Sequence, residues 1–573
     1  MVAAVAMALP LSAAASIEAE AEANLVSVIV QESHGAGDAP ERAVARLGGH
    51  VDRQIAIIDG FTAKLPRASL PALRTSRGVR VVTEDARVRL TAAIDGWDHE
   101  SDGGSLTRLT KMTGAAKYWT RGFTGKGVDV ALIDSGVAPV EGLSVPGKVV
   151  NGPDLSFESQ EESLRHLDTF GHGTHMAGII GARDSSARKR VKRAQKRSYV
   201  GMAPDARIIS LKVADRGGAT DVSQVIAAID WVVQHRNTDG LNIRVLNLSF
   251  GTDGVQDYRI DPLAYAAEVA WHKGIVVVAS AGNAGFGSAK LNNPAYDPYV
   301  IAVGGSDPKG TDVKNDDDIP AWSSAGDGTR NPDIVAPGRS VVSLRVPGSA
   351  IDTAAPAARV GHSRFFRGSG TSQAAAMVSG AAALVISQRP TITPDQVKGL
   401  LMGTAETLEG KDPRAQGAGA LDLGKAIDDP TPQVVQTWET SDGTGSLDAA
   451  RGSQHLENNG VTLDGERDIF GNPWDGRTWS ADAWNGRTWS GGTWNGSVWT
   501  GSTWSGSSWS GSAWTGSSWS GSSWSGSAWT GSSWSGSAWT GRTWSGSVWT
   551  GSAWTGSTWS GGPWSSAAWG NES

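Results

Sequence analysis

The chain has 573 residues, of which 19% are charged, and a formal net charge of −7. A chain of this length is several times a typical domain, so we expect more than one domain. The mildly acidic balance gives no general attraction to nucleic acid or anionic lipid, so charge does not set the partners, and we expect no nucleic acid among them. The absence of cysteine excludes disulfides, thiol catalysis and cysteine-ligated metal.

Residues 1–24 are predicted to be a leader. The run MVAAVAMALPLSAAAS is apolar and ends in small residues, as a secretory signal does. It lacks the usual Lys or Arg at its start, which leaves open an upstream start or a plain Ala-rich leader. The run is too short to span a bilayer, and no later segment reaches about 18 uninterrupted apolar residues. We therefore expect a secreted, extracellular protein with no membrane span.

Residues 25–91 predict a small α+β domain. Short β-type runs (LVSVIV, QIAIIDGFTAKL, VRVVTEDARV) are separated by two helical stretches (APERAVARL, SLPALRTS).

Residues 92–427 predict an α/β domain with a doubly wound, mainly parallel sheet. The apolar strands VDVALI, ARIISLKV, IRVLNLS and IVVVAS alternate with helical stretches such as SQVIAAIDWVVQ. In such folds the functional residues gather beyond the carboxyl ends of the strands.

The remainder of the chain changes character twice. Residues 428–470 are polar and rich in Gly, Ser and Pro, which predicts a linker. In residues 471–573 a tryptophan occurs at every fifth position from Trp474 to Trp569, which accounts for 20 of the 26 tryptophans. This segment is a true repeat, and we treat it as a low-complexity tail.

Two acid–base candidates stand in the α/β domain. Asp134 follows the strand VDVALI directly, although an Asp there is most often a turn former or a helix cap. His172 lies in GHGTHMAG, which predicts a tightly packed helix. His172 and His175 could instead be zinc ligands, but no nearby glutamate follows as in catalytic zinc helices. A structural core histidine is the other alternative.

A nucleophile candidate and a donor candidate complete the set. Ser372 precedes the apolar stretch AAAMVSGAAALVIS, where a serine is usually only a helix cap. A nucleophile at this place also gains the positive end of the helix dipole beside the developing negative charge. Asn283 follows the strand VVVAS and is either a turn residue or an N–H donor to an oxyanion.

The motifs VALIDSGV, GHGTHMAG, VVVASAGNAG and GTSQAAAMVSG resemble those of the subtilisin-like serine peptidases, the subtilase family, and share their Asp, His, Ser order. The resemblance implies a serine endopeptidase that acts on proteins and peptides without a cofactor. It implies Ser372 as nucleophile, His172 as general base, Asp134 as the residue that orients the histidine, and Asn283 in the oxyanion hole.

The resemblance also implies a cleft in which an extended substrate pairs as an added strand. The corresponding segments are Gly218, Ala219 and Thr220 on one side and Ser249, Phe250 and Gly251 on the other. One position departs from the family pattern, because Ala376 stands where the family usually has proline. Alanine favours helix, so we expect the helix of the nucleophile to persist.

Two further properties follow from the resemblance. Residues 25–91 have the element order of an inhibitor-like pro-region, which implies self-cleavage between Arg89 and Gly104. Many subtilases bind structural calcium. The acid cluster Asp316–Asp318 is one candidate, but no calcium ligand can be assigned from the sequence.

The five-residue period of the tail fits neither a flat strand nor an α-helix, because both scatter the tryptophans over different faces. A solenoid with five residues per side keeps them equivalent, whereas a flexible chain displays them singly. Evenly spaced rings suit stacking on glycans, which favours attachment to cell wall or polysaccharide. An alternative function is a catalytically inactive scaffold that acts through this tail.

Overall fold

The structure, a computed structural model, describes residues 25–84 except 34 and 56–57, and residues 98–475 except 188–197, 255, 288–290, 362, 459–460 and 469–472. Between 488 and 566 it describes the backbone of a set of strands. The predicted leader lies outside the described residues. The chain separates into two compact units, Met1–Ala92 and Ala93–Ser573.

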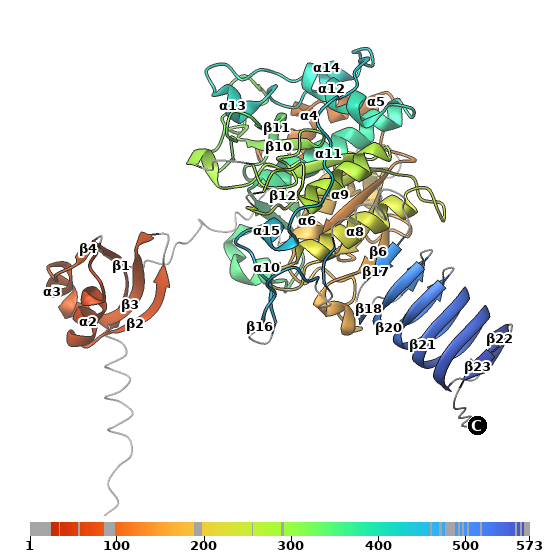
Figure 1. Ribbon diagram of the computed structural model, residues 1–573. Helices are drawn as coiled ribbons and strands as arrows, with labels where there is room; N and C mark the ends of the chain where they lie inside the picture. The colour runs from red at the N-terminus through yellow and green to blue at the C-terminus, as the bar shows by residue number, and fades with distance from the viewer. Residues whose placement is uncertain are drawn as a thin grey trace, which may run out of the picture. The chain divides into compact units, whose positions relative to one another are not determined.

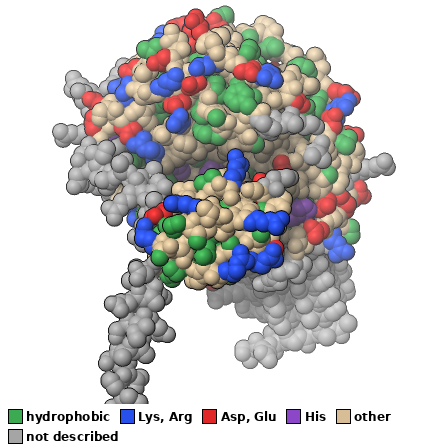
Figure 2. Space-filling view, turned by 90° about the vertical axis from the view of Figure 1, so that its left-hand side faces the viewer, with side chains coloured by type: hydrophobic (Ala, Val, Ile, Leu, Met, Phe, Trp, Pro, Cys, Tyr) green, Lys and Arg blue, Asp and Glu red, His purple; other side chains and the backbone are tan. Residues whose placement is uncertain are grey.

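The N-terminal unit is a small α+β domain, as predicted. Its four strands form an antiparallel sheet in the order β2-β3-β1-β4. The two helices close a separate core that includes Val28, Val30 and Phe61, all fully buried. Figure 2 views this unit from one side, and several Lys and Arg side chains stand on the face it shows. The elements are β1 (Leu25–Glu32), α2 (Ala39–Arg46), β2 (His50–Ile55), β3 (Gly60–Pro66), α3 (Leu70–Arg74) and β4 (Val79–Glu84).

The second unit is built on a seven-stranded sheet in the order β11-β10-β9-β8-β5-β7-β6, and every neighbouring pair is parallel. Strands buried on both faces are apolar throughout rather than alternating, and β5 and β9 are buried at every residue. The predicted doubly wound sheet is confirmed. Its strands are β5 (Asp129–Asp134), β6 (Val149–Asp154), β7 (Arg207–Lys212), β8 (Ile243–Leu248), β9 (Val276–Ser280), β10 (Ile301–Ser306) and β11 (Ile334–Pro337).

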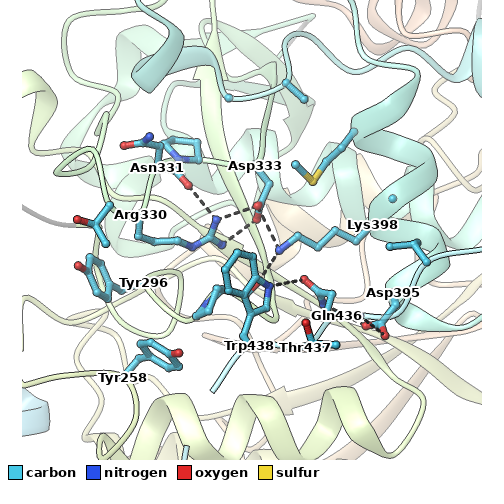
Figure 3. Close-up of a pocket in the computed structure, with 18 of the residues that line it drawn as sticks. Tyr258, Tyr296, Arg330, Asn331, Asp333, Asp395, Lys398, Gln436, Thr437 and Trp438 are labelled. Carbon is cyan, nitrogen blue, oxygen red and sulfur yellow. Dashed lines mark hydrogen bonds and ion pairs between the residues drawn. The ribbon is translucent and has the colours of Figure 1, made fainter. Parts of the chain in front are cut away.

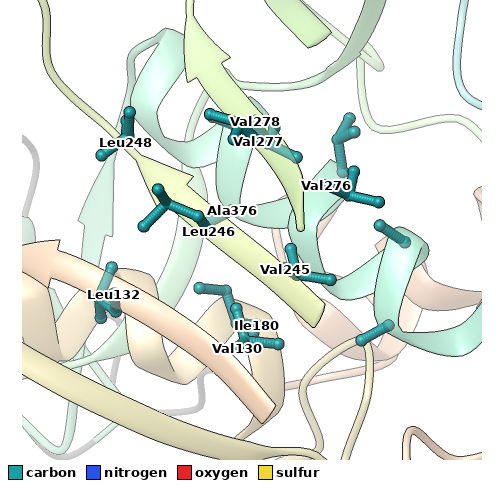
Figure 4. Packing of buried hydrophobic residues seen from close by; sticks show 14 of the residues in the cluster. Val130, Leu132, Ile180, Val245, Leu246, Leu248, Val276, Val277, Val278 and Ala376 are labelled. Carbon is teal, nitrogen blue, oxygen red and sulfur yellow. The ribbon is translucent and has the colours of Figure 1, made fainter. Parts of the chain in front are cut away.

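Helices flank this sheet (Figure 1). Helices α6 and α11 pack against each other, as do α8 and α9, and both pairs contact the strands. Figure 4 shows Val130, Leu246 and Val277 of the sheet close to Ile180 of α6 and Ala376 of α11, and all five are fully buried. The helices are α6 (His172–Gly181), α8 (Val222–His235), α9 (Pro262–His272) and α11 (Thr371–Gln388).

Smaller elements surround this core. Strands β12 (Val341–Leu344), β13 (Arg359–Val360) and β14 (Phe365–Gly368) form a three-stranded antiparallel sheet. The short helices are α4 (Leu106–Met112), α5 (Ala115–Thr120), α10 (Ala350–Ala354), α12 (Pro394–Gly403), α13 (Pro413–Gln416) and α14 (Leu423–Ala426).

The stretch 428–470 differs from the linker that its composition predicts. Leu447 and Ala450 of α15 (Leu447–Arg451) belong to the main hydrophobic core, and Arg451 is fully buried. Hydrogen bonds and one short helix hold most of this stretch in place. Neither leaves a long amphipathic pattern in the sequence, so the packing of the stretch was not predicted. We call residues 430–456 the C-terminal strap. A short hairpin follows it, formed by β15 (Glu457–Asn458) and β16 (Val461–Thr462).

The C-terminal strap forms one wall of a cavity of about 730 Å³ (Figure 3). Gln436 of the strap donates to the Asp395 carboxylate across a distance of 3.0 Å. Among the other lining residues, Asp333 lies between Arg330 and Lys398, at 2.7 and 3.1 Å. The buried charges of Asp333, Arg330 and Lys398 therefore pair with one another inside the protein. None of the predicted site residues lines this cavity.

The strands of the tail pair in parallel with a constant register. Trp489 pairs with Trp504 and Trp504 with Trp519, so the register advances by 15 residues, or three five-residue repeats, per turn. This arrangement is the solenoid alternative, with three repeats in each coil. The strands are β17 (Thr488–Ser490), β18 (Thr493–Trp494), β19 (Val498–Thr500), β20 (Thr503–Thr515), β21 (Ser518–Thr555), β22 (Thr558–Gly561) and β23 (Trp564–Ser566).

Within the described residues, no helix combines the length and the apolar character that crossing a membrane requires.

Candidate active site

Asp134 and His172 meet at the carboxyl edge of the sheet. Asp134 is the last residue of β5, and His172 is the first residue of α6. The histidine Nδ1 lies 2.8 Å from Asp134 Oδ1 and 3.0 Å from Oδ2. Asp134 is 6% exposed, whereas the His172 side chain keeps 23% of its surface exposed. The imidazole is therefore anchored on its buried side and accessible on the other.

A second carboxylate, Asp168, braces this pair and was not found from the sequence. Asp168 is fully buried and accepts hydrogen bonds from Gly171 N–H at 2.6 Å, Thr174 N–H at 2.7 Å and the Ser135 hydroxyl at 2.8 Å. It thus ties the first turn of α6 to the residue that follows Asp134. The only signal in the sequence was an Asp four residues before His172, which a turn explains equally well.

The environment of His172 changes its protonation. Burial lowers the pKa of His172, but the negative charge of Asp134 and its hydrogen bond, together with Asp168, raise it by more. The pKa of His172 therefore lies above its ordinary value of 6.5. Since the hydrogen bond to Asp134 engages Nδ1, Nε2 is the atom left to exchange a proton.

Ser372 lies in the first turn of α11, which begins at Thr371. The predicted helix is confirmed, but it starts before Ser372 rather than after it. Its hydroxyl donates to the carbonyl of Ser249 at 2.9 Å, and the Ser249 hydroxyl donates to the carbonyl of Ser372 at 3.1 Å. The start of α11 is therefore fixed to the segment that follows β8. Ala376, where the family usually has proline, is fully buried within the same unbroken helix.

Asn283 is oriented by the same helix start. Its Oδ1 accepts from the Thr371 backbone N–H at 2.9 Å and from the Thr371 hydroxyl at 3.1 Å. With the oxygen engaged in this way, the amide nitrogen is the end that can donate to a bound ligand.

The structure does not join all the predicted residues directly. Among the described residues no hydrogen bond links Ser372 to His172, and Ser372 instead donates to Ser249. His172 is nevertheless hydrogen-bonded to Asp134 at the end of β5, and Ser372 to Ser249 just after β8. These two strands are neighbours in the parallel sheet, so both side chains belong to one region of the molecule. Catalytic hydrogen bonds are often long or poorly aligned before substrate binds.

The two predicted cleft segments are both constrained. Gly218 has φ +75°, a backbone conformation that favours glycine, and a Cβ at this residue would lie 2.6 Å from the Phe170 ring. On the other side, Thr252 directly follows Gly251 and exchanges two backbone hydrogen bonds with Asn293, both 3.0 Å long. Ala219, Thr220, Ser249 and Phe250 complete these segments.

His175 fits the alternative of a structural core histidine. It is 5% exposed, and burial, followed by the charge of His172, lowers its pKa to about 3. It therefore stays neutral. In the part of the chain that the structure describes, the one group whose ligand atoms could share a metal is Asp448, His455 and Asp464, which includes neither histidine of the GHGTHMAG motif.

The acid cluster at Asp316–Asp318 is partly engaged by the protein itself. Asp318 pairs with Lys411 at 2.8 Å and with Lys309 at 3.5 Å. Asp317 is fully buried, and burial together with Asp316 raises its pKa to about 7. Calcium at this cluster stays a prediction, and no ligand is assigned to it.

Comparisons with known proteins decide the family. The subtilase family model (Peptidase_S8) matches residues 125–419. The chain belongs to the subtilase family. This subtilase is 36% identical to serine protease AprX of Bacillus subtilis over 311 residues, which cover 53% of this chain and 67% of AprX.

It is also 30% identical to subtilisin amylosacchariticus of Bacillus subtilis subsp. amylosacchariticus over 367 residues, which cover 64% of this chain and 80% of that protein. The enzyme is thus a serine-type endopeptidase with the subtilase fold.

The raised pKa of His172 predicts a pH profile. As pH falls, His172 takes up a proton above pH 6.5 and cannot act as a base, so kcat/KM should fall through that range. Asp134→Asn removes the main interaction that raises this pKa, so the midpoint should shift to lower pH while kcat drops by roughly 10⁴-fold. Hydrolysis rates of a peptide measured from about pH 8 to pH 5 test both points, and a flat profile would contradict a histidine base.

The orientation of Asn283 predicts a selective loss of turnover. Asn283→Ala should lower kcat by about 10² to 10³ with little change in KM, because the donor acts on charge that appears only in the transition state. Asn331→Ala is a matched control, since Asn331 accepts a hydrogen bond from Gly328 in an exposed loop. If Asn283→Ala raised KM by as large a factor as it lowered kcat, the result would argue against an oxyanion role.

Proposed function

We propose that this subtilase is a secreted endopeptidase, made as a self-processing zymogen, that hydrolyses proteins through Asp134, His172 and Ser372. The observation that carries this proposal is the 2.8 Å hydrogen bond between His172 Nδ1 and Asp134. It leaves Nε2 of a partly exposed imidazole free to act, in the same region as a serine at the start of a buried helix. This combination supplies a base and a nucleophile for acyl transfer.

The chemistry proceeds in two halves. Ser372 Oγ attacks the scissile carbonyl carbon and gives its proton to His172 Nε2, and the carbonyl electron pair becomes the oxyanion. The C–N bond then breaks as His172 returns the proton to the leaving amine, which leaves an acyl-enzyme. His172 then takes a proton from water, whose oxygen attacks the ester carbonyl carbon. The bond from that carbon to Ser372 Oγ breaks as His172 returns the proton to Oγ, which releases the acid and restores the serine. Asp134 holds the tautomer and stabilises the histidine cation throughout.

The oxyanion has two donors in this proposal. The backbone N–H of Ser372 lies in the first turn of α11, where helix N–H groups have no partner within the helix. The Asn283 amide nitrogen is the second donor. Both are fixed before substrate binds, so little reorganisation is needed when charge develops.

The N-terminal unit acts as the pro-region and intramolecular inhibitor in this proposal. Its independent core supports a segment that folds as a unit of its own. Cleavage is proposed between Arg89 and Gly104, and residues 89–97 of that window lie outside the described residues.

Residues 98–104 of the proposed cleavage range are described and bear on where the cut can lie. Asp102 pairs with Arg367, and a Cβ at Gly104 would lie 1.9 Å from the carbonyl of Ser340. These contacts tie both residues to the peptidase unit, which supports a proposed cut before Asp102.

Secretion is supported by the apolar leader of the sequence. A relative that is 30% identical over 280 residues, covering 49% of this chain and 35% of its own, is named minor extracellular protease Epr of Bacillus subtilis. The domain order that we propose is leader, pro-region, peptidase and repeat tail, with the C-terminal strap counted as part of the peptidase.

Ser372→Ala tests the catalytic proposal and the processing proposal together. Hydrolysis of an unfolded protein should fall by roughly 10⁶-fold, as loss of the nucleophile does in subtilisin, because no base can activate an alanine. The variant should keep residues 25–91 attached, as N-terminal sequencing of secreted material would show. If the wild-type protein shows no hydrolysis that a serine-directed inhibitor blocks, the inactive scaffold is the better reading. Removal of the pro-region from the variant would refute self-processing alone.

The tail is proposed to hold the enzyme on cell-wall or other glycan surfaces. In its parallel solenoid, tryptophan positions pair with tryptophan positions in successive coils. Neighbouring paired strands lie about 4.8 Å apart, so the tryptophan positions form rows along the solenoid. Rows of aromatic rings suit stacking on sugar rings.

A deletion of residues 476–573 tests the role of the tail. This cut leaves the C-terminal strap intact, so kcat/KM for a peptide should be unchanged while retention on insoluble wall material drops. A cut before Thr431 is unsuitable, because it removes Leu447 and Ala450 from the core. Unchanged retention of the shortened protein would contradict attachment through the tail.

A further inference from the structure

Arg451 is a buried cation that the catalytic proposal does not use. Its side chain has no exposed surface. Nε donates to Asp221 Oδ2 at 2.6 Å, and Nη1 donates to Asp448 Oδ1 at 3.1 Å and to the carbonyl of Gly465 at 2.7 Å; Nη2 donates to the carbonyl of Arg467. An arginine held in this way is a rigid connector, because all three nitrogens of its planar guanidinium group donate hydrogen bonds.

The partner of Arg451 directly follows one side of the proposed substrate cleft. Asp221 is 2% exposed and comes next after Thr220. Its Oδ1 accepts from Ser223 N–H at 2.9 Å and so caps α8, while Gln224 Oε1 accepts from the Asp221 N–H at 2.7 Å and the Thr220 hydroxyl at 3.2 Å. Arg451 therefore holds the junction between the segment Gly218–Thr220 and helix α8.

The turn after α15 reaches the other side of the cleft. Asp253 stands two residues after Gly251, and it accepts from Ser453 N–H at 2.7 Å and from the Ser453 hydroxyl at 2.5 Å. The backbones also touch here. A Cβ on Gly254 would lie 2.8 Å from the carbonyl of Ala449, and a Cβ on Gly452 would lie 2.6 Å from Gly254 N.

One short segment from outside the family match thus contacts the residues that flank both cleft segments. The match ends at residue 419, whereas these contacts come from residues 446–453. Leu447 and Ala450 anchor the segment in the core beside α8 and α9. The segment can therefore fix the distance between the two sides without touching the substrate.

We propose that residues 446–453 are a positioning element of the substrate cleft, with Arg451 as the positioning residue for Gly218–Thr220 and Ser453 as that for Ser249–Gly251. This inference rests on the proposed assignment of those two segments to substrate binding. It makes the C-terminal strap part of what determines affinity for extended peptides. Its effect should therefore grow with the number of substrate residues that pair along the cleft.

The test compares long and short substrates in the full-length protein. Arg451→Met keeps the unbranched apolar part of the side chain and removes its hydrogen bonds. For peptides with four residues before the scissile bond, KM should rise by about tenfold, because small displacements far from the chemistry weaken alignment. For a one-residue ester, kcat and KM should stay as in the wild type, and so should the rate of labelling by a serine-directed fluorophosphonate.

Two further variants keep the test decisive. Ser453→Ala removes the hydroxyl bond to Asp253 without leaving a buried charge. It therefore provides the test if Arg451→Met does not fold. It should also raise KM for the long peptide, by a smaller factor. Arg414→Met is the matched control, since Arg414 pairs with Asp412 at 2.8 Å on the surface, and it should change nothing.

The outcomes separate two failures. If the folded variants have a lower melting temperature but keep the wild-type KM for long and short substrates alike, residues 446–453 are only structural. The positioning role is then overturned. An equal loss on both kinds of substrate overturns it as well. If the wild-type protein is not labelled by the fluorophosphonate, the proposed catalytic function fails instead, whatever the variants do.

Discussion

Parallel pairing of the central strands is the constraint on which the site depends. Leu132 of β5 pairs with Asn247 of β8, so the residues two positions further on, Asp134 and Ser249, emerge at the same edge of the sheet. Strand β9 continues the same direction, and Asn283 follows its end. Helix α11 then returns across the sheet with its start at this edge, which brings Ser372 to Ser249. Residues separated by more than 200 positions in the chain thus reach one place because parallel strands end together.

Buried charge is the second organising feature, because an ion removed from water must find a partner inside the protein. Asp134 has His172, Asp168 has three donors, and Asp221 has Arg451. Each partnership also joins two segments that are distant in the chain. The same interactions that offset desolvation therefore set the geometry of the proposed cleft, and this is why the C-terminal strap behaves as part of the peptidase rather than as a connector.

The sequence predicted the elements whose signals are local. Apolar strands and amphipathic helices identified the α/β unit and the smaller α+β unit, and four motifs pointed to Asp134, His172, Asn283 and Ser372. The sequence did not identify Asp168, whose role depends on three donors that only the turn before α6 brings together. It also predicted a linker for 428–470. Composition cannot show that a short helix such as α15 fills a place left between α8 and α9, because that place exists only after both helices have packed.

The sequence by itself thus determined the family, the order of the chemical groups and the five-residue period of the tail, since these depend on residue identity and spacing. Tertiary structure decided the rest. The period closes into coils of three repeats because strands pair at an offset of 15 residues, and no single repeat specifies that offset. The buried arginine at 451 appears in the sequence as an ordinary charged residue of a polar stretch. Only the fold supplies Asp221 as its partner, because the free energy of burying a charge depends on what surrounds it and not on its neighbours along the chain.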